Sequence, residues 1–319
     1  MSTTEILTQL VSPDSPESAR QELFQQFVES PITPEKLATT ADFLRSHMLS
    51  VDIDRNALDT CGTGGSGQDT INTSTTIALL LTTLGAKVAK HGNRSASGKC
   101  GSFDLLEAAG VNIEITPEKE KKLFDQLGLV FLYARTHHPI MGRLAPLRKA
   151  YGQRTIFNLV GPLCSPARVK LQLLGVSDLD SARLITGALH NLATDDERAL
   201  VVHALDGLDE ISLFSDTLAL RVTKDEIQES TISPTDFNIK NPQHGELEGG
   251  ETSKNLETFQ QIIHGKGTET QKNFIALNAA HALQLDQPDI SIQKAFDLCM
   301  DALATDRCAQ LLSRYQELS

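Results

Sequence analysis

Short apolar runs alternate with helix-like segments along most of the chain, and this alternation limits the possible folds more than any other feature. β-compatible runs cover residues 57–61, 86–89, 129–134 and 199–202, whereas helical patterns cover 73–84, 103–109, 117–127, 142–151 and 182–193. Strands that alternate with helices usually form a parallel sheet with helices packed on its faces. The sequence therefore predicts an α/β fold with a mostly parallel central sheet flanked by helices.

The two ends of the chain have a helical pattern without strands. We expect three short helices between residues 3 and 48, interrupted by prolines, and three amphipathic helices after Glu251 that cover a face of the sheet. The stretch from Lys224 to Glu251 is rich in Pro, Asp, Gly and Asn. We expect this stretch to be a partly exposed connection.

Charge and cysteine content exclude several classes of partner. The chain has 41 acidic and 29 basic side chains, a formal net charge of −12, and no block of Lys or Arg, so no nucleic-acid partner is expected. Its five cysteines are widely spaced and form no C-x-x-C pair, which favours free thiols in a reducing compartment over a zinc site. No apolar run approaches the ~18 residues of a membrane span, and no export signal is visible. We expect a cytoplasmic protein without membrane contact.

A glycine-rich segment follows the first predicted strand. Residues 61–67 read Cys-Gly-Thr-Gly-Gly-Ser-Gly, and a predicted helix begins shortly after them. Glycine lets backbone amides turn toward an anion, and a helix N-terminus adds further donors. The segment lacks the Lys-Ser or Lys-Thr ending of a Walker loop, which disfavours nucleoside triphosphate hydrolysis. A phosphate or pyrophosphate site is predicted, although an ordinary glycine turn with capping residues would explain the cluster if it stood alone.

Two further segments extend the predicted anion site. Lys90–Arg94 closes the second predicted strand, and α/β sheets bind ligands at the carboxyl ends of their strands. Residues 95–102 again combine glycines and hydroxyls before a helix, which suits a second phosphate. A substrate with phosphate groups at both ends would account for both phosphate-binding segments.

An acidic turn and two isolated motifs complete the candidates. Asp209 and Glu210 lie in a predicted loop, where both carboxylates can converge on magnesium bridged to pyrophosphate; a solvated acidic turn is an equal alternative. The pair His137–His138 has no cysteine or carboxylate close in sequence, so we reject a metal site there. Arg148 taken alone would be an ordinary surface cation.

Taken together, these motifs resemble those of the anthranilate phosphoribosyltransferase family of tryptophan biosynthesis, which has the nucleoside phosphorylase class III fold. The resemblance runs from about Ala57 to the C-terminus and rests on motifs in the same order: residues 62–67, 72–75, 90–94, 137–139, 148, 158–163 and 206–210. It implies transfer of a phosphoribosyl group from phosphoribosyl pyrophosphate to anthranilate, with magnesium (Mg²⁺) as the cofactor.

The resemblance also assigns residues to each ligand. For phosphoribosyl pyrophosphate it implies Gly62, Gly65, Ser66, Thr70, Asn72, Thr73, Ser74, Thr75, Lys90, His91, Gly92, Asn93, Arg94, Ser97, Gly98 and Ser102. For anthranilate it implies Gly62, Asn93, His138, Arg148 and Gly161. Magnesium would be held by Ser74, Asp209 and Glu210, and the catalytic residues would be Lys90, Asp209 and Glu210.

The family further implies a small helical domain and a large α/β domain. We expect the helical domain at residues 1–54, joined by helices from about 138–165, and the α/β domain at residues 55–319. A homodimer through the N-terminal helices is implied as well. The chain departs from the family at Ser66, where an Asp is common, and in an N-terminal region about one hairpin shorter. It also has Ile71 and Thr73 where the family's Phe-Asn-Ile-Ser-Thr run has Phe and Ile. These departures put the metal number and the dimer in question.

Two alternatives stay open at this point. The first is a paralogue of the same fold, acting on another aromatic acceptor or as a nucleoside phosphorylase. The second is a binding protein without catalytic activity. The segment 90–94 together with Arg148 disfavours the phosphorylase, and the presence of Lys90, Asp209 and Glu210 disfavours a non-catalytic protein.

Overall fold

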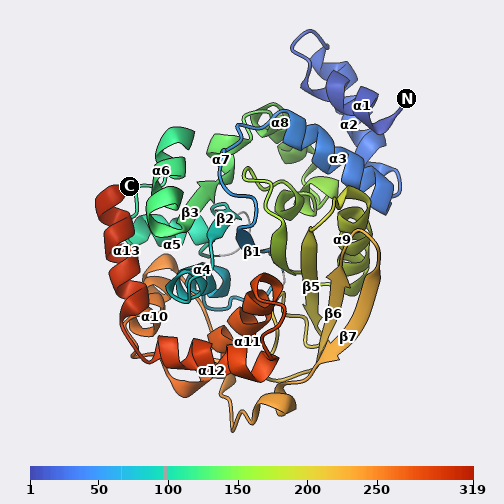
Figure 1. Cartoon of the computed structure of the whole chain (residues 1–319). Coiled ribbons are helices and arrows are strands. Elements are labelled where there is room, and N and C mark those ends of the chain that lie inside the picture. The colour runs from blue at the N-terminus through green and yellow to red at the C-terminus, as the bar shows by residue number, and fades with distance from the viewer. Residues whose placement is uncertain (66, 96–98) are drawn as a thin grey trace.

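A twisted sheet forms the centre of the molecule in the computed structural model, which describes residues 1–65, 67–95 and 99–319 (Figure 1). The predictions for Ser66, Ser97 and Gly98 lie outside the described residues. Within these residues the sheet has seven strands in the order β3-β2-β1-β4-β5-β6-β7. The strands are β1 (Leu58–Gly62), β2 (Val88–Gly92), β3 (Leu129–Tyr133), β4 (Leu171–Gly175), β5 (Arg198–Ala204), β6 (Thr217–Val222) and β7 (Ile227–Ile232). Strands β1–β5 are parallel to one another, β6 pairs antiparallel with β5, and β7 pairs antiparallel with β6, which confirms the predicted α/β class.

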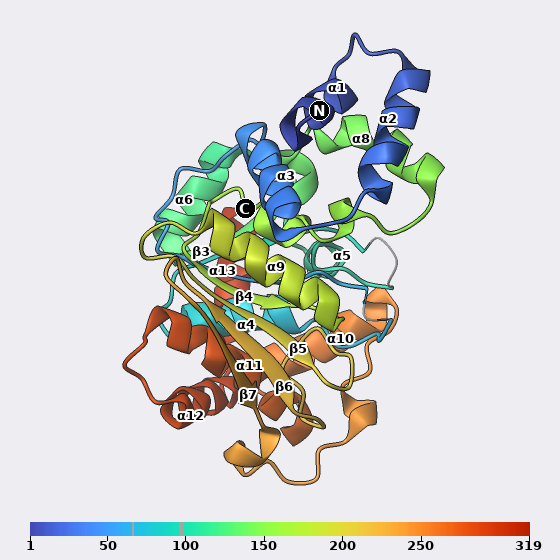
Figure 2. The same ribbon diagram turned by 90° about the vertical axis from the view of Figure 1, so that its right-hand side faces the viewer.

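Helices cover both faces of this sheet. They are α1 (Thr3–Val11), α2 (Glu17–Glu29), α3 (Pro34–Ser46), α4 (Thr73–Thr83), α5 (Ser102–Ala108), α6 (Pro117–Leu127), α7 (Ala134–His137), α8 (Met141–Tyr151), α9 (Leu179–Leu192), α10 (Thr252–Ile263), α11 (Glu269–Asp286), α12 (Ile292–Leu303) and α13 (Arg307–Leu318). Figure 2 shows α9, overlaid by α3, on one side of the sheet and α4 with α11 on the other. Because both faces are covered, the parallel strands are largely buried and rich in apolar residues, with Asp59 and Lys90 as buried charged exceptions.

Two expectations about the elements were wrong, and two strands were missed. Four helices, not three, follow Glu251, because the extra helix α11 is buried on all sides and so has no amphipathic stripe to detect. Strand β7 lies inside the stretch 224–251 that we expected to be a connection. Its polar side chains are mostly exposed, because it is the edge strand and pairs only with β6. The sequence pattern also missed β4 and β6.

The N-terminal helices pack together with α8 at one end of the molecule (Figures 1 and 2). Phe24 of α2 stacks on Phe157, with ring centroids 5.9 Å apart, and Tyr151 at the end of α8 meets Phe24 edge-on at 6.0 Å. The Arg45 Nε of α3 donates to the Leu163 carbonyl at 2.6 Å. This packing places segments near residues 138–165 beside α1–α3; the domain boundary at residue 54 stays a prediction.

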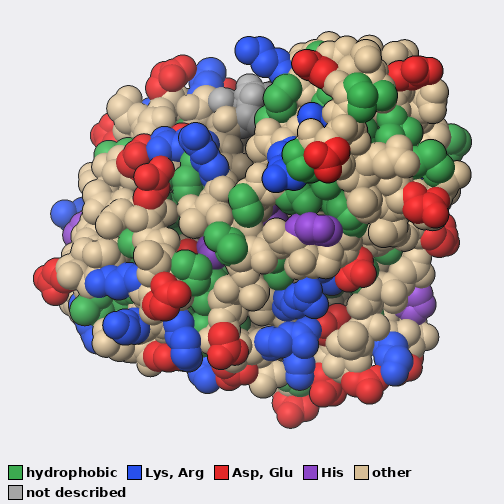
Figure 3. All heavy atoms as spheres, turned by 90° about the horizontal axis from the view of Figure 1, so that it is seen from above, with side chains coloured by type: hydrophobic (Ala, Val, Ile, Leu, Met, Phe, Trp, Pro, Cys, Tyr) green, Lys and Arg blue, Asp and Glu red, His purple; other side chains and the backbone are tan. Residues whose placement is uncertain are grey.

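The surface mixes charges of both signs. On the face shown in Figure 3, acidic and basic side chains are interspersed without a large patch of Lys and Arg alone. Among the described helices, none is both long enough and apolar enough to cross a bilayer.

Candidate active site

The carboxyl ends of the parallel strands bring the predicted motifs to one edge of the sheet. The glycine segment follows β1, residues 90–94 end β2, and the acidic pair follows β5. The Thr63 N–H donates to the Gly175 carbonyl at the end of β4 at 2.9 Å, and the Gln68 amide donates to the Asp206 carbonyl at 2.9 Å. These contacts join the glycine loop to the acidic loop across β4. The structure thus brings together motifs that lie more than a hundred residues apart.

The acidic pair lies directly beside the glycine loop and the start of α4. The Asp209 Oδ2 is 3.0 Å from the position that a Cβ on Gly62 would occupy, so a side chain there would press on the Asp209 carboxylate. The Thr70 hydroxyl lies 3.5 Å from Glu210 Oε2. Burial, and then the charge of Asp209, raise the pKa of Glu210 to about 8, while Thr73 and Thr70 oppose this effect. Two carboxylates that repel each other at a partly buried edge fit a hard divalent cation such as magnesium.

The start of α4 supplies further donors near this pair. Asn72 is the N-cap residue, and Thr73, Ser74 and Thr75 form the first turn. The Asn72 side chain makes no capping bond to the helix amides, and the Thr75 hydroxyl donates to the Asn72 Oδ1 at 3.4 Å. An uncapped helix N-terminus is a favourable place for a phosphate.

Lys90 is buried beside β1 and does not lie in an open cleft. Its side chain is 2% exposed, and its Nζ donates to the Thr60 carbonyl at 2.7 Å. Burial lowers the pKa of Lys90, and the neighbouring Asp59 opposes this shift. The sequence analysis missed Asp59. An acidic residue in the middle of the apolar run 57–61 was the available signal.

Asp59 is fully buried, and its carboxylate is only partly hydrogen-bonded. Its Oδ1 accepts the His91 N–H at 3.0 Å, whereas no partner for Oδ2 is found among the described residues. Burial raises the pKa of Asp59 to about 7, with Lys90 opposing the shift. The folded protein therefore holds a proton here that the unfolded chain releases near pH 4. The stability that this proton provides is fully present below pH 4 and is lost as the pH rises through about 7.

We expect Asp59→Asn to flatten this pH dependence. Between pH 5 and pH 7.5 the wild-type free energy of unfolding should fall by about 2 kcal/mol more than that of the variant. Urea denaturation at both pH values measures the difference. Asp125→Asn on the exposed face of α6 is the control and should follow the wild type. An equal change in wild type and Asp59→Asn would contradict the shifted pKa.

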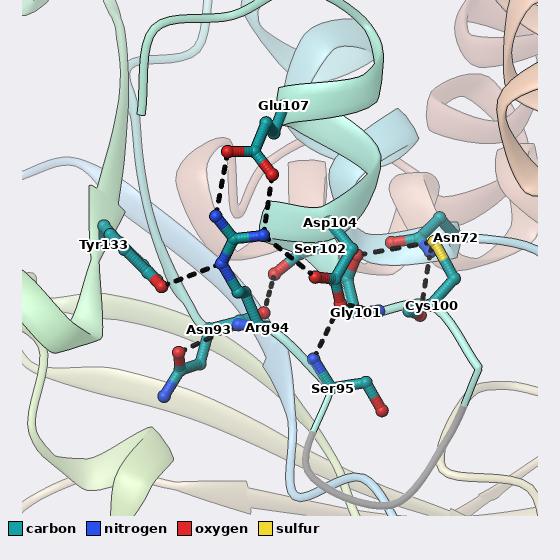
Figure 4. Close-up of polar contacts among 10 residues, drawn as sticks. All are labelled: Asn72, Asn93, Arg94, Ser95, Cys100, Gly101, Ser102, Asp104, Glu107 and Tyr133. Atoms are coloured by element: carbon teal, nitrogen blue, oxygen red, sulfur yellow. Dashed lines mark hydrogen bonds and ion pairs between the residues drawn. The ribbon is translucent and has the colours of Figure 1, made fainter. Parts of the chain in front are cut away.

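Arg94, which was assigned to the phosphoribosyl donor, bonds to protein groups in the structure, and its role toward the donor stays a prediction (Figure 4). Two of its guanidinium nitrogens donate to the Glu107 carboxylate at 2.6 and 2.8 Å, and its Nε donates to the Tyr133 hydroxyl at 3.1 Å. A weaker contact of 3.4 Å joins it to Asp104. These bonds tie the end of β2 to α5, so the charge of Arg94 is largely neutralised within the protein.

Asp104 closes the base of the second predicted phosphate loop (Figure 4). Its Oδ2 accepts both the Ser95 N–H at 2.9 Å and the Gly101 N–H at 2.8 Å. A Cβ on Gly101 would lie 2.3 Å from the Ser95 nitrogen, so this narrow neck requires glycine. The Ser102 hydroxyl donates to the Asn93 carbonyl at 3.2 Å. Sequence spacing places Asp104 in a first helical turn but does not show that one carboxylate joins both ends of the loop.

The residues assigned to anthranilate lie on several different segments of the chain. His138 is buried, and its ring centroid lies 5.3 Å from that of His91. Burial, and then His137, lower the pKa of His138 to about 4, so its imidazole is neutral near pH 7. Arg148 is half-buried on α8, with its guanidinium carbon 5.9 Å from the Phe157 ring centroid. Gly161 begins the short helix η2 (Gly161–Leu163). The roles of these residues stay predictions.

A family profile defines the class of protein. The profile described as "Glycosyl transferase family, a/b domain" matches residues 54–308, which include every strand of the sheet. Together with the glycine-rich loops at the sheet edge, this match defines the chain as a glycosyltransferase.

Curated relatives and solved structures define the family. The anthranilate phosphoribosyltransferase of Persephonella marina is 38% identical over 287 residues, covering 89% of this chain and 84% of that protein. The one of Herpetosiphon aurantiacus is 40% identical over 288 residues, covering 90% and 85%. The crystal structure of the Thermus thermophilus enzyme is 32% identical, with a TM-score of 0.89, covering 99% of this chain and 94% of that chain. The chain belongs to the anthranilate phosphoribosyltransferase family, which confirms the resemblance seen in its motifs.

A more distant structure supports the fold alone. The anthranilate phosphoribosyltransferase of Saccharomyces cerevisiae in complex with PRPP and Mg has a TM-score of 0.84 at 21% identity, covering 99% of this chain and 91% of that chain. The topology is therefore retained after most of the sequence has diverged.

Proposed function

We propose that this chain transfers the 5-phosphoribosyl group from phosphoribosyl pyrophosphate to anthranilate, giving N-(5-phosphoribosyl)anthranilate and pyrophosphate in tryptophan biosynthesis. The observation that carries this proposal is the meeting of the glycine loop, the α4 N-terminus and the Asp209–Glu210 pair at one sheet edge. The donor in the yeast complex, PRPP with Mg, has the phosphate groups that such a site suits.

The reaction needs no protein nucleophile. The anthranilate amine attacks the anomeric carbon of the ribose while the bond from that carbon to pyrophosphate breaks. Loop amides near Gly62 and Gly65, the α4 first turn and Asn72 would hold the phosphates in line for attack. Magnesium, held by Asp209, Glu210 and Ser74, would neutralise charge on the departing pyrophosphate. Lys90 would add positive charge near the start of the loop, since its Nζ lies 2.7 Å from the carbonyl of Thr60 in β1.

A fluorescence assay tests the proposed activity. Purified protein mixed with phosphoribosyl pyrophosphate, magnesium and anthranilate should consume anthranilate, and its fluorescence should decay only when all three are present. Persistent fluorescence in the complete mixture would overturn the proposal. Phosphate-dependent release of a free base from a nucleoside would instead favour a phosphorylase of the same fold.

Arg148→Ala should affect the acceptor selectively. A half-buried guanidinium on α8 is a suitable partner for the anthranilate carboxylate, because its planar fork can make two parallel hydrogen bonds. We expect the KM for anthranilate to rise about tenfold or more, while the KM for the donor changes little. Steady-state kinetics with each substrate varied in turn measures both constants. Equal losses for both substrates would point to misfolding and contradict the assignment.

We also propose the wider setting of the enzyme. Residues 1–54 with segments of about 138–165 would form the helical domain, as the packing of α1–α3 against α8 supports. A homodimer through these helices is proposed, and light scattering coupled to gel filtration tests it. The five cysteines are free thiols, which supports a reducing, cytoplasmic location.

A further inference from the structure

Arg154 lies in a short link whose two ends are both fixed. On one side, Gly152 ends α8 in the left-handed conformation, with φ +71°, and its N–H donates to the Arg148 carbonyl at 3.1 Å. On the other side, Thr155 and Asn158 form a capping box at the start of η1 (Ile156–Asn158), where the Thr155 N–H donates to Asn158 Oδ1 at 2.8 Å. The backbone that carries Arg154 is therefore held in place before any ligand binds.

The guanidinium of Arg154 lies over the glycine loop. A Cβ placed on Gly65 would lie 2.8 Å from the Arg154 Nη2 and 3.1 Å from its Cζ. Gly65 has φ +80°, a conformation that favours glycine, and the missing side chain is what lets the guanidinium approach the loop backbone. The helical end of the molecule thereby places a cation against the loop that follows β1.

The donors of Arg154 are free for a ligand. Arg154 is exposed, and within the described part of the chain no hydrogen bond or ion pair engages its guanidinium. The two cations assigned from the sequence differ in this respect. Arg94 is paired with Glu107 and Tyr133, and the Lys90 ammonium donates to a backbone carbonyl. The chain has a formal net charge of −12. A guanidinium without a partner among the described residues, next to a glycine loop of the kind that binds anions, is therefore unusual.

We propose that Arg154 is a substrate-binding residue that donates to phosphate oxygens of the phosphoribosyl donor held by the glycine loop. The inference rests on the proposed function. A guanidinium suits phosphate because its planar fork makes paired, charge-assisted hydrogen bonds. The donor is then gripped from two sides, by loop amides at the sheet edge and by Arg154 from the link between α8 and η1. A fixed backbone at Arg154 lowers the entropy cost of this contact.

Titration calorimetry with phosphoribosyl pyrophosphate and magnesium tests the proposal without depending on turnover. Arg154→Gln should bind the donor about ten- to a hundredfold more weakly than the wild type, because a charge-assisted contact is lost. Arg154→Lys should lie between the two, since it keeps the charge and loses the fork. The matched control is Arg183→Gln, which removes an exposed guanidinium on α9 that pairs with Glu229 at 3.4 Å. This control should bind as the wild type does.

Two fragments of the donor, inorganic pyrophosphate and ribose 5-phosphate, show which phosphate group of the donor Arg154 contacts. If Arg154 contacts the leaving group, Arg154→Gln weakens binding of inorganic pyrophosphate with magnesium; if it contacts the 5-phosphate, the loss appears with ribose 5-phosphate. The inference is overturned if Arg154→Gln binds the donor and both fragments with unchanged affinity. It is also overturned if the substitution raises only the KM for anthranilate. Failure of the wild type itself to bind the donor would instead overturn the proposed function.

Discussion

Asp209→Asn combined with Glu210→Gln should lower turnover by about a hundred- to a thousandfold or more, even at saturating magnesium. Both substitutions keep the side-chain size, but each replaces one carboxyl oxygen by an amide nitrogen and removes the ability to carry a negative charge. Burial, and then the charge of Asp209, raise the pKa of Glu210 to about 8, so a cation that neutralises both carboxylates would stabilise the pair. Without the pair, magnesium and the departing pyrophosphate would lose the anchor that we propose for them.

Fluorescence kinetics over a range of magnesium concentrations measures the effect. The matched control replaces Asp195 and Asp196, an adjacent acidic pair in a turn with side chains 82% and 83% exposed, by Asn. This control should keep wild-type turnover. Near wild-type turnover of the Asp209–Glu210 double variant at high magnesium would refute the metal role of the pair.

Gly175→Ala should abolish most activity although residue 175 need not touch a substrate. A Cβ at this position would lie 1.6 Å from the Asp209 carbonyl oxygen and 2.6 Å from its carbonyl carbon, both of which are backbone atoms. No rotamer change relieves such an overlap, so the loop that carries Asp209 and Glu210 must move away from β4. We expect a loss of about 1–3 kcal/mol in unfolding free energy and a fall in turnover of about a hundredfold, as follows from small misplacements of positioning groups.

Chemical denaturation and kinetics on the same preparation separate the two effects. The control is Gly142→Ala in α8, where nothing lies within 4 Å of the added Cβ. Alanine in a helix should leave turnover unchanged and raise the free energy of unfolding by up to about 1 kcal/mol. A Gly175→Ala enzyme with normal turnover would mean that the acidic loop tolerates displacement.

Much of the fold and of the candidate site was predictable because the signals are local. Glycines before a helix, a cation-rich strand end and adjacent acids each depend on neighbouring residues, and strand–helix alternation directs them to one sheet edge. The predicted helix 117–127 coincides with α6, which Pro117 begins and Gly128 ends. Strand β7 and helix α11 escaped prediction because an edge strand can be polar and a fully buried helix lacks a stripe.

The sequence by itself determined the class of fold and the chemical groups available to the site. Only the tertiary structure decided which of those groups are free to act. Arg94 and Arg154 are the same residue type, yet Arg94 bonds to Glu107 and Tyr133, whereas Arg154 lies against Gly65 and has no hydrogen-bond or ion-pair partner among the described residues. The physical reason is that hydrogen bonds and charges are satisfied by spatial neighbours. Whether a charged side chain is paired depends on residues from other elements that folding brings next to it, and a local sequence pattern does not show these neighbours.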